Sequence, residues 1–417
     1  MDEKPAIRWL VCILLLAFVL RCGAAIWWQQ RRPHDEPFAM GDSVSYWHLA
    51  HEISAGQPYA YPDERARVFR TPLYPLVLAP LFWISDGEPN PLMARLLGCL
   101  FGTWAVWEVM QIGFRFAGKR AAIASGIFAA LYPGAIAMSI LVLAEALFCP
   151  LMLASLRFLA WRTDDQEKES TIGGYLRAGI FSGLATLARP SWLLCLPLIW
   201  TAVLIDRKVT FKLKRDVILG SLLGLAVVMA PWWWRCYRLT GHFVLTSLQV
   251  GASLYDGLHE GATGASNMEF TKSFEQEFIR SRPSDDGEDF EYALDRAYRH
   301  EAVRWSQENP ERVAELVGIK LRRMWKPWPS AEMFGSLKMR FIVSVGFSAV
   351  FVFGIMGLIR SWNRGWRVWL FASPVIYFTL LHVVFVSSIR YRQPAMLLWC
   401  VPAGFGLILL AEHFRSD

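Results

Sequence analysis

The first residues that could do chemistry stand between Phe38 and Gly56, in the stretch FAMGDSVSYWHLAHEISAG. Its first acid, Asp42, stands just before a run with helical spacing that begins near Ser43 and ends at Gly56. One interpretation makes Asp42 the N-cap of that helix, with its carboxylate accepting backbone N–H bonds. The other makes it a carboxylate that takes a proton from an acceptor hydroxyl or amine. Both interpretations stay open.

Arginines form the second group, because each of them stands beside a long apolar segment. They are Arg390 and Arg392 in SSIRYRQPAM, Arg189 in LARPSW, Arg95 in PLMARLL and Arg70 in FRTPLYP. A cation at membrane depth is costly and suggests a partner of opposite sign, such as a lipid phosphate held by guanidinium groups. The alternative is that each arginine pairs with a nearby carboxylate or snorkels to the headgroups. For the RYR pair the anion interpretation is favoured, since two neighbouring cations repel each other without an anion.

Glu145 is a third candidate, because it interrupts the apolar run SILVLAEALFCP. A carboxylate inside a membrane segment must face protein or a wet cavity. A neutral, hydrogen-bonded core acid is the competing interpretation. His48 and His51 could share a helix face and hold a divalent metal together with an acid. Two histidines at this spacing are a weak signal, however, and surface histidines without a role are the more frequent case.

The composition indicates what must position these side chains. The chain has 417 residues, of which 54% are hydrophobic and only 19% charged, and its net charge is +7. This balance is too apolar for an ordinary soluble domain. In a membrane protein the surplus of cations lies in cytoplasmic loops, so it does not indicate nucleic-acid binding. The seven cysteines form no CxxC pair and fit small buried residues.

Apolar runs long enough to cross a bilayer need about 20 residues. About ten such spans are predicted, so the expected fold is an all-α polytopic bundle. The candidates are 7–28, 91–115, 120–133, 135–157, 173–188, 190–206, 217–235, 341–360, 367–386 and 393–412. A further run, LYPLVLAPLFWI at 73–84, is too short to cross and fits an interfacial or re-entrant element.

The Lys and Arg of the short loops set the expected orientation. If the spans alternate, the basic loops and both termini fall on the cytoplasmic side. Loop 29–90, with short helices, and the charged, mostly helical segment 236–340 then lie outside. We therefore expect an N-terminal membrane module over 1–235, an outer domain over 236–340 and a C-terminal membrane module over 341–417.

The order of several motifs resembles that of polyprenyl-phosphate-sugar-dependent glycosyltransferases of the GT-C superfamily. The resemblance is to bacterial relatives of the protein O-mannosyltransferases and of the aminoarabinose transferases that act on lipid A. The motifs are Asp42 with Tyr46, Gly56 to Tyr59, Arg70 to Pro75 with Tyr74, ARLLGCLFG with Arg95, Tyr132-Pro133 before Glu145, GLATLARP at 183–190, the outer segment 240–264 and RYRQP with Tyr391. No single motif is decisive, but their order across the chain is fairly specific.

The resemblance implies an inverting sugar transfer from a polyprenyl-phosphate donor at the outer face of a bacterial inner membrane. Asp42 would be the general base or would orient the acceptor. Arg390 and Arg392, together with Arg189 or Arg70, would hold the phosphate. The cavity or acceptor site would be lined by Tyr46, Tyr59, Tyr74, Glu145, Arg95 and Tyr391. The acceptor would be a protein, a lipid or a glycan.

Two departures from the family pattern bear on the substrate and on a metal. Ser43 stands where relatives often carry a second acid beside the first, which weakens the case for a metal. Gly257-Leu258-His259-Glu260 replaces the G-N-N-P-type turn of relatives. A lipid or solute transporter with an outer-facing anion site is the alternative function. Such a protein more typically shows internal repeats, and no clear repeat is visible here.

Overall fold

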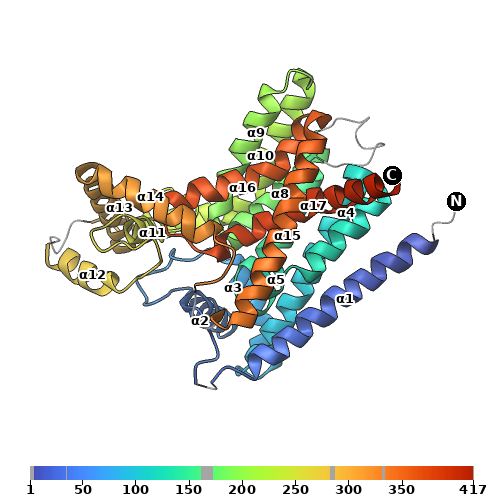
Figure 1. The fold of residues 1–417 in the computed structure, drawn as a ribbon. Helices are drawn as coiled ribbons and strands as arrows, with labels where there is room; N and C mark the ends of the chain where they lie inside the picture. The colour runs from blue at the N-terminus through green and yellow to red at the C-terminus, as the bar shows by residue number, and fades with distance from the viewer. Residues whose placement is uncertain (1–3, 34, 161–171, 282–286, 331–333, 417) are drawn as a thin grey trace.

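The computed structural model describes residues 4–33, 35–160, 172–281, 287–330 and 334–416, and the regular structure in these ranges is entirely helical (Figure 1). The helices are α1 (Lys4–Gln29), α2 (Gly41–Ser54), α3 (Leu73–Ile84), α4 (Pro91–Leu131), α5 (Pro133–Ile140), α6 (Glu145–Ala160), α8 (Ile172–Ala188), α9 (Cys195–Ile205), α10 (Phe211–Thr240), α11 (Val250–Gly257), α12 (Phe270–Ser281), α13 (Phe290–Glu308), α14 (Pro310–Trp325), α15 (Leu337–Ser361), α16 (Trp366–Val384) and α17 (Gln393–Ser416). Short 3₁₀ turns lie at Pro190–Trp192 (η1), Trp362–Arg364 (η3) and Ile389–Arg392 (η4). The predicted all-α class is confirmed.

Six of the described helices are long and apolar enough to cross a bilayer, so the chain is a multi-pass membrane protein. They are α1, α4, α10, α15, α16 and α17. The remaining predicted spans fall on shorter helices, namely α5 with α6, α8, and η1 with α9. The predicted short element at 73–84 is α3, a helix of 12 residues with Pro80 inside it.

Helix α4 contains two antiparallel arms, because its backbone leaves helical geometry at Ala117 and Gly118. Gly118 has φ = +79°, a value that favours glycine. A Cβ on Gly113 would lie 3.1 Å from Ser125 Oγ. On a straight helix, residues twelve positions apart are about 18 Å apart. The chain therefore turns back at Gly118, at the junction between the predicted spans 91–115 and 120–133.

The bundle packs closely where small residues line the helix contacts. Gly179 of α8 faces α10 so closely that an added Cβ would lie 2.1 Å from Ser221 O. A Cβ added to Gly224 of α10 would likewise lie 2.2 Å from Leu176 O of α8. Such small-residue contacts let two helix backbones approach each other in a membrane. They fix α8, whose last residues lead into the Arg189 turn.

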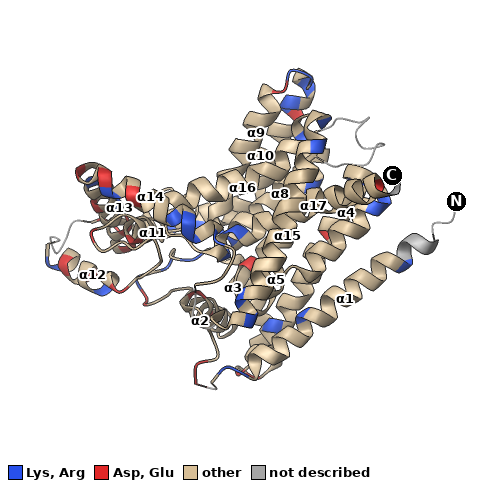
Figure 2. Ribbon diagram, viewed as in Figure 1, with Lys and Arg blue, Asp and Glu red and all other residues tan. Residues whose placement is uncertain are grey.

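Charges inside the bundle are paired or capped. Arg157 of α6 hydrogen-bonds Glu108 of α4 through Nε and Nη2, and both side chains are buried. Arg21 of α1 is fully buried and donates to the carbonyls of Ala129 and Ala130. Those carbonyls belong to the last turn of α4. Carbonyls in the last turn of a helix have no intrahelical hydrogen-bond partner and carry partial negative charge. Figure 2 shows the long helices mainly uncharged along their middles.

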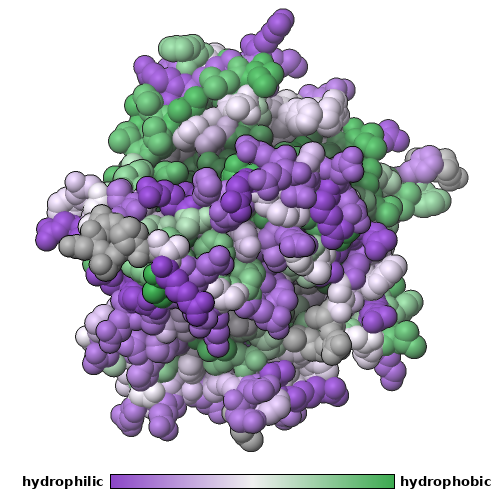
Figure 3. Space-filling model, turned by 90° about the vertical axis from the view of Figure 1, so that its left-hand side faces the viewer, coloured by the Kyte–Doolittle hydropathy of each residue, from purple (hydrophilic) through white to green (hydrophobic). Residues whose placement is uncertain are grey.

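Helices α11 to α14 form a separate layer beside the ends of the long helices (Figure 1). Seen from the side that carries α12 and α13, the molecule presents a mostly hydrophilic face, with apolar surface toward its margins (Figure 3). α10 continues to Thr240, five residues past the boundary expected at 235. The layer reaches the first loop through Arg65, which pairs with Glu275, and through Arg67, which pairs with Asp289.

Candidate functional site

Five charged side chains from distant parts of the chain meet in one ion-pair network. Asp42 comes from α2, Arg70 from the loop before α3, Glu145 from the start of α6, Arg189 from the turn after α8, and Arg390 from η4. Three of them, Arg189, Arg390 and Glu145, lie at breaks between apolar helices. The network holds three cations and two acids, so it carries a surplus of one positive charge.

Arg390 is the link between the two acids. Its Nε and Nη2 bind the two oxygens of Glu145, the second at 3.1 Å, and its Nη1 binds Asp42 Oδ2 at 2.8 Å. This bidentate arrangement fixes the geometry as well as adding charge-assisted hydrogen bonds. Every nitrogen of the Arg390 guanidinium therefore already has a carboxylate partner.

Asp42 lies in the first turn of α2 and does not cap it. The N-cap residue is Met40, and its side chain makes no capping bond. Of the two interpretations, the N-cap is wrong, because the helix already starts at Gly41 and the Asp42 carboxylate turns toward arginines. Its Oδ1 accepts a bond of 2.7 Å from Arg70 Nη2. Ser43 Oγ donates to Leu141 O at 2.9 Å and so ties α2 to the break before α6.

The pKa of Asp42 follows from its two partners. Burial alone would raise it, but the charges of Arg70 and Arg390 and their hydrogen bonds outweigh burial and hold it well below its usual range. Asp42 is therefore ionised at neutral pH. The same cations make it a weak base in the free protein.

Glu145 is the first residue of α6, and it is fully buried. The sequence predicts one span over 135–157, but the structure breaks it at 141–144 between α5 and α6. Val142 in this break has φ = +53°, which is strained for a β-branched residue. The break places Glu145 at a helix N-terminus, where a carboxylate is favoured. Glu145 also pairs with Arg189 and Arg390, so it is not the neutral core acid of the competing interpretation.

Within the described part of the chain, Arg189 and Arg70 each have a guanidinium nitrogen without a hydrogen-bond partner. Arg189 uses Nη1 for Glu145 and Nε for Ser191 Oγ. Arg70 uses Nη2 for Asp42, and its buried Nε has no hydrogen-bond partner among the described residues. Arg70 also lies over the ring of Tyr46 at 5.1 Å. These two guanidinium groups are the cations of the network that are not fully engaged.

Two predicted arginines lie outside the network. Arg392 is fully buried, donates to the carbonyls of Met324 and Lys326 at 2.7 and 2.9 Å, and lies 3.7 Å from the ring centroid of Phe347. The two cations of RYR thus point to different partners, and the expectation that they hold one anion together does not match this geometry. Arg95 binds Gln29 Oε1, Ile140 O and Pro37 O, a position that secures the first loop.

The predicted tyrosines take different positions. Tyr391 lies in η4 between Arg390 and Arg392, and the Arg189 guanidinium is 5.3 Å from its ring centroid. Tyr46 and Tyr74 meet edge to face at 5.2 Å beneath Arg70. Tyr59 Oη lies 3.2 Å from the carbonyl oxygens of Arg70 and Thr71, and so supports the segment that presents Arg70.

One residue near the network was not predicted. His382 stacks on Tyr391 with ring centroids 4.0 Å apart, and its Nδ1 lies 2.8 Å from Val386 O. The only sequence signal for it was a histidine near the end of the predicted span 367–386. His48 and His51 lie apart from it, His48 against Tyr61 and His51 beside Glu52. Among the described residues no group of three or more His, Cys, Asp or Glu side chains could hold a metal ion.

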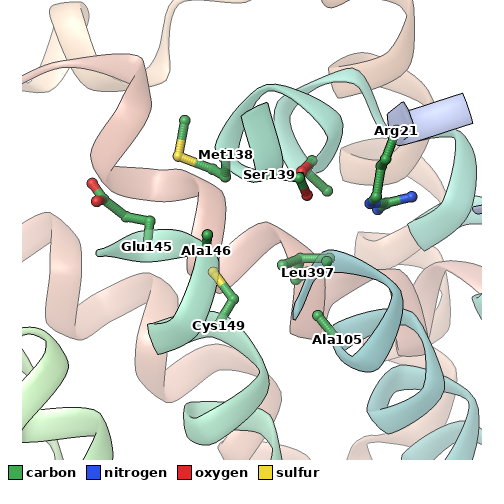
Figure 4. Close-up of a pocket in the computed structure, with 10 residues that line it drawn as sticks. Arg21, Ala105, Met138, Ser139, Glu145, Ala146, Cys149 and Leu397 are labelled. Atoms are coloured by element: carbon green, nitrogen blue, oxygen red, sulfur yellow. The ribbon is translucent and has the colours of Figure 1, made fainter. Parts of the chain in front are cut away.

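A small cavity lies behind the network. Its volume is about 10 Å³, and its lining includes Arg21, Ser139, Glu145 and Cys149 (Figure 4). Figure 4 shows the Glu145 carboxylate at the side of the cavity opposite Arg21. This volume is close to the minimum for a single water molecule. It cannot hold a sugar.

Comparison with known proteins finds one family model and several solved structures that are similar to this chain. Residues 70–234 match the family model described as dolichyl-phosphate-mannose-protein mannosyltransferase. No curated protein matches the chain. The matched segment runs from Arg70 into α10 and includes Glu145 and Arg189.

Solved structures show the fold. The oligosaccharyltransferase AglB of Archaeoglobus fulgidus, solved with an inhibitory peptide and a dolichol-phosphate, is similar over 98% of this chain and 51% of its own, with TM-score 0.59 and 14% identity. The apo form of the A. fulgidus oligosaccharyltransferase gives a TM-score of 0.58 over 100% of this chain and 52% of its own, also at 14% identity. ArnT of Cupriavidus metallidurans, solved with undecaprenyl phosphate, gives a TM-score of 0.47 over 98% of this chain and 78% of its own, at 14% identity. The chain spans about half the length of the archaeal proteins.

Over residues 70–234 the chain is similar to the dolichyl-phosphate-mannose-protein mannosyltransferases, and over nearly its whole length its fold is similar to that of the archaeal oligosaccharyltransferase. The predicted resemblance to lipid-phosphate-sugar glycosyltransferases is confirmed over the matched residues and in the fold. The match over residues 70–234 supports the predicted enzyme class, a glycosyltransferase with a lipid-phosphate sugar donor.

The segment that presents Arg70 is held by Glu291 of α13. The Glu291 carboxylate accepts backbone bonds from Arg67 at 2.8 Å and Val68 at 2.9 Å. Burial raises the pKa of Glu291 from 4.5 to about 7, against the opposing effect of these N–H groups. A folded-state pKa above the unfolded value means that folding favours the protonated form. The contribution of Glu291 to the free energy of unfolding is then fully present below pH 4.5 and is lost as the pH rises through about 7.

We expect the thermal unfolding midpoint of the protein in detergent to fall between pH 4.5 and pH 7, and Glu291→Gln to reduce that fall. The matched control is Glu275→Gln in the same layer, which removes an outer ion pair with Arg65 and should leave the slope unchanged. Equal slopes in all three proteins would show that Glu291 does not titrate in this window.

Proposed function

We propose that the chain transfers a sugar from a polyprenyl-phosphate donor to an acceptor at the outer face of a bacterial inner membrane. The observation that carries the proposal is the ion-pair network, in which Arg70 and Arg189 keep free nitrogens and the sum of charges is positive. One bound anion would balance the surplus positive charge of this network. The family match supports a lipid phosphate as that anion.

The donor phosphate would lie between Arg189 and Arg70. Guanidinium groups bind phosphate with directed, charge-assisted hydrogen bonds. Arg390 would hold Asp42 and Glu145 in place and contribute its charge, because its nitrogens are already engaged. In this arrangement Arg392 has no direct role. The archaeal AglB, similar in fold, was solved with a dolichol-phosphate.

Asp42 would act on the acceptor. It is ionised at neutral pH, and each oxygen accepts one arginine bond, which leaves further lone pairs for an acceptor hydroxyl or amine. The acceptor atom would attack the anomeric carbon on the face opposite the phosphate, with inversion. The bond from that carbon to the phosphate oxygen breaks, and polyprenyl phosphate leaves with the electron pair. The acceptor proton passes to Asp42 late in the step, when phosphate charge near Arg70 raises the basicity of the carboxylate.

Arg189 and Arg70 would stabilise the negative charge that develops on the departing phosphate. Donors fixed before the reaction, in a site with little water, give the largest catalytic effect. Arg189 is held by Glu145 and Ser191, and Arg70 by Asp42 and the ring of Tyr46. Both groups are therefore preorganised.

The membrane arrangement follows from the same assignment. We propose ten crossings, with the two arms of α4 counted separately, α5 and α6 counted together as one crossing, and α8 and α9 as shorter crossings. Both termini would then be cytoplasmic, and α2, α3 and α11–α14 would lie outside. The acceptor would be a protein, lipid or glycan that approaches between α2 and this outer layer.

Replacing Asp42 by asparagine tests its role. We expect Asp42→Asn to lower the release of polyprenyl phosphate from a polyprenyl-phosphate sugar by at least about 100-fold, because the proton acceptor is lost. The measurement is product release by purified protein in lipid, with thermal unfolding as the check on folding. Turnover at the original rate in a folded variant would reduce Asp42 to a structural partner of arginine. Lipid movement across a vesicle wall without bond cleavage would favour a transporter.

The phosphate role of Arg189 and Arg70 predicts a change in donor binding. Arg189→Gln and Arg70→Gln should each weaken the binding of polyprenyl phosphate by about tenfold or more, the effect of one charge-assisted hydrogen bond. The control is Arg65→Gln, which removes a partly exposed arginine from the same loop but outside the network. Binding by calorimetry in detergent gives the affinities. Unchanged affinity in both network variants would reject the phosphate assignment.

A further inference from the structure

A second group of cations lies where α14 ends and α15 begins. The corner cluster consists of Arg322, Arg323 and Lys326 at the end of α14 and of Lys338 and Arg340 at the start of α15. Figure 2 shows Lys and Arg at the end of α14 that lies toward α16. None of the five has an ion-pair partner among the described residues.

The cations of the corner cluster act on one another. Burial, and then the charges of Arg323, Arg340 and Arg322, lower the pKa of the Lys326 ammonium. Arg322, Lys338 and Arg340 are exposed, and Lys326 is half-buried. The cluster is therefore a concentration of positive charge open to the outside, and its mutual repulsion is unrelieved by carboxylates in the described part of the chain.

Helix capping explains only part of this cluster. Cations in the last turn of α14 complement the negative end of that helix, which accounts for Arg322 and Arg323. Lys338 and Arg340 stand in the first turn of α15, which contains no acid. Cations at that end of a helix are unfavourable, because the free N–H groups already carry partial positive charge. Their placement points to an external anion.

The surface that continues from the corner cluster is apolar. Along the first turns of α15, Leu337 is 84% exposed, Phe341 70% and Val345 51%. α15 is one of the helices long and apolar enough to span a bilayer, and in a bilayer these exposed side chains would face lipid tails. Trp328, 47% exposed, lies in the segment that joins the two helices, and tryptophan is enriched at the level of lipid headgroups. Lys338 and Arg340 thus stand where phosphates of the bilayer lie.

The cluster lies close to the network but is distinct from it. The carbonyl of Lys326 accepts a hydrogen bond from Arg392, two residues beyond Arg390 on η4. Arg323 Nε lies 3.4 Å from Ser387 O, just before the same turn. One side of this short segment therefore carries the network, and the other carries the corner cluster.

We propose that the corner cluster binds the headgroup of an anionic phospholipid of the surrounding bilayer, with the lipid tail lying along Leu337, Phe341 and Val345 of α15. Charge complementarity to the headgroup and the exposed apolar face below it support a lipid rather than a soluble anion. Snorkelling to water would satisfy single lysines or arginines, but it leaves five like charges together. The proposal does not depend on the sugar-transfer function.

Native mass spectrometry tests this with protein in detergent and equal amounts of phosphatidylglycerol and phosphatidylcholine. The protein should retain one phosphatidylglycerol in preference to phosphatidylcholine. Lys326→Gln with Arg340→Gln should lower that retention by about thirtyfold, the effect of two cations near a lipid surface. A second pair, Arg322→Gln with Lys338→Gln, changes only exposed side chains and should act in the same direction.

The control pair is Lys272→Gln with Arg280→Gln, two exposed cations of α12, which should leave retention unchanged. Equal retention of the two lipids, or phosphatidylglycerol retention unaffected by both corner pairs, would overturn the proposal. So would displacement of phosphatidylglycerol by millimolar inorganic phosphate, since the site would then be specific for a soluble anion.

Discussion

The contact of Arg390 with Glu145 and Asp42 is the interaction on which the site depends. It joins η4, α6 and α2, which are separated by up to 348 positions in the chain. Two carboxylates this close would repel each other without a cation between them, and a buried guanidinium without acids would be costly. Without Arg390, Asp42 would pair with Arg70 alone and Glu145 with Arg189 alone, and nothing would join the two acids.

The breaks in the apolar helices are what bring these charges together. A continuous helix over 135–157 would place Glu145 in the middle of a span, remote from α2. The irregular segment at 141–144 ends α5, starts α6 at Glu145, and offers Leu141 O to Ser43. The turn after α8 and the turn η4 likewise bring Arg189 and Arg390 to the network. Non-helical backbone at membrane depth occurs where it is buried in protein or lines a cavity, and all three breaks meet at the network.

The sequence predicted the helical class, the position of most apolar segments and all five members of the network. Hydrophobic runs and misplaced charges are local signals, so Asp42, Arg70, Glu145, Arg189 and Arg390 could be singled out one by one. Which arginine pairs with which acid depends on backbone direction, and this is why Arg392 was grouped with Arg390 although it faces Met324. The break at Val142 was missed because its residues are as apolar as those of a continuous span. Glu291 was missed because its role depends on a contact with Arg67 and Val68, more than 220 positions away.

An experimental structure of the protein with bound polyprenyl phosphate would test the central claim most directly. The account predicts that the phosphate lies within hydrogen-bonding distance of Arg189 and Arg70, with the contacts of Arg390 to Asp42 and Glu145 intact. A phosphate bound elsewhere, with Arg189 and Arg70 unchanged and facing only their carboxylates, would contradict it.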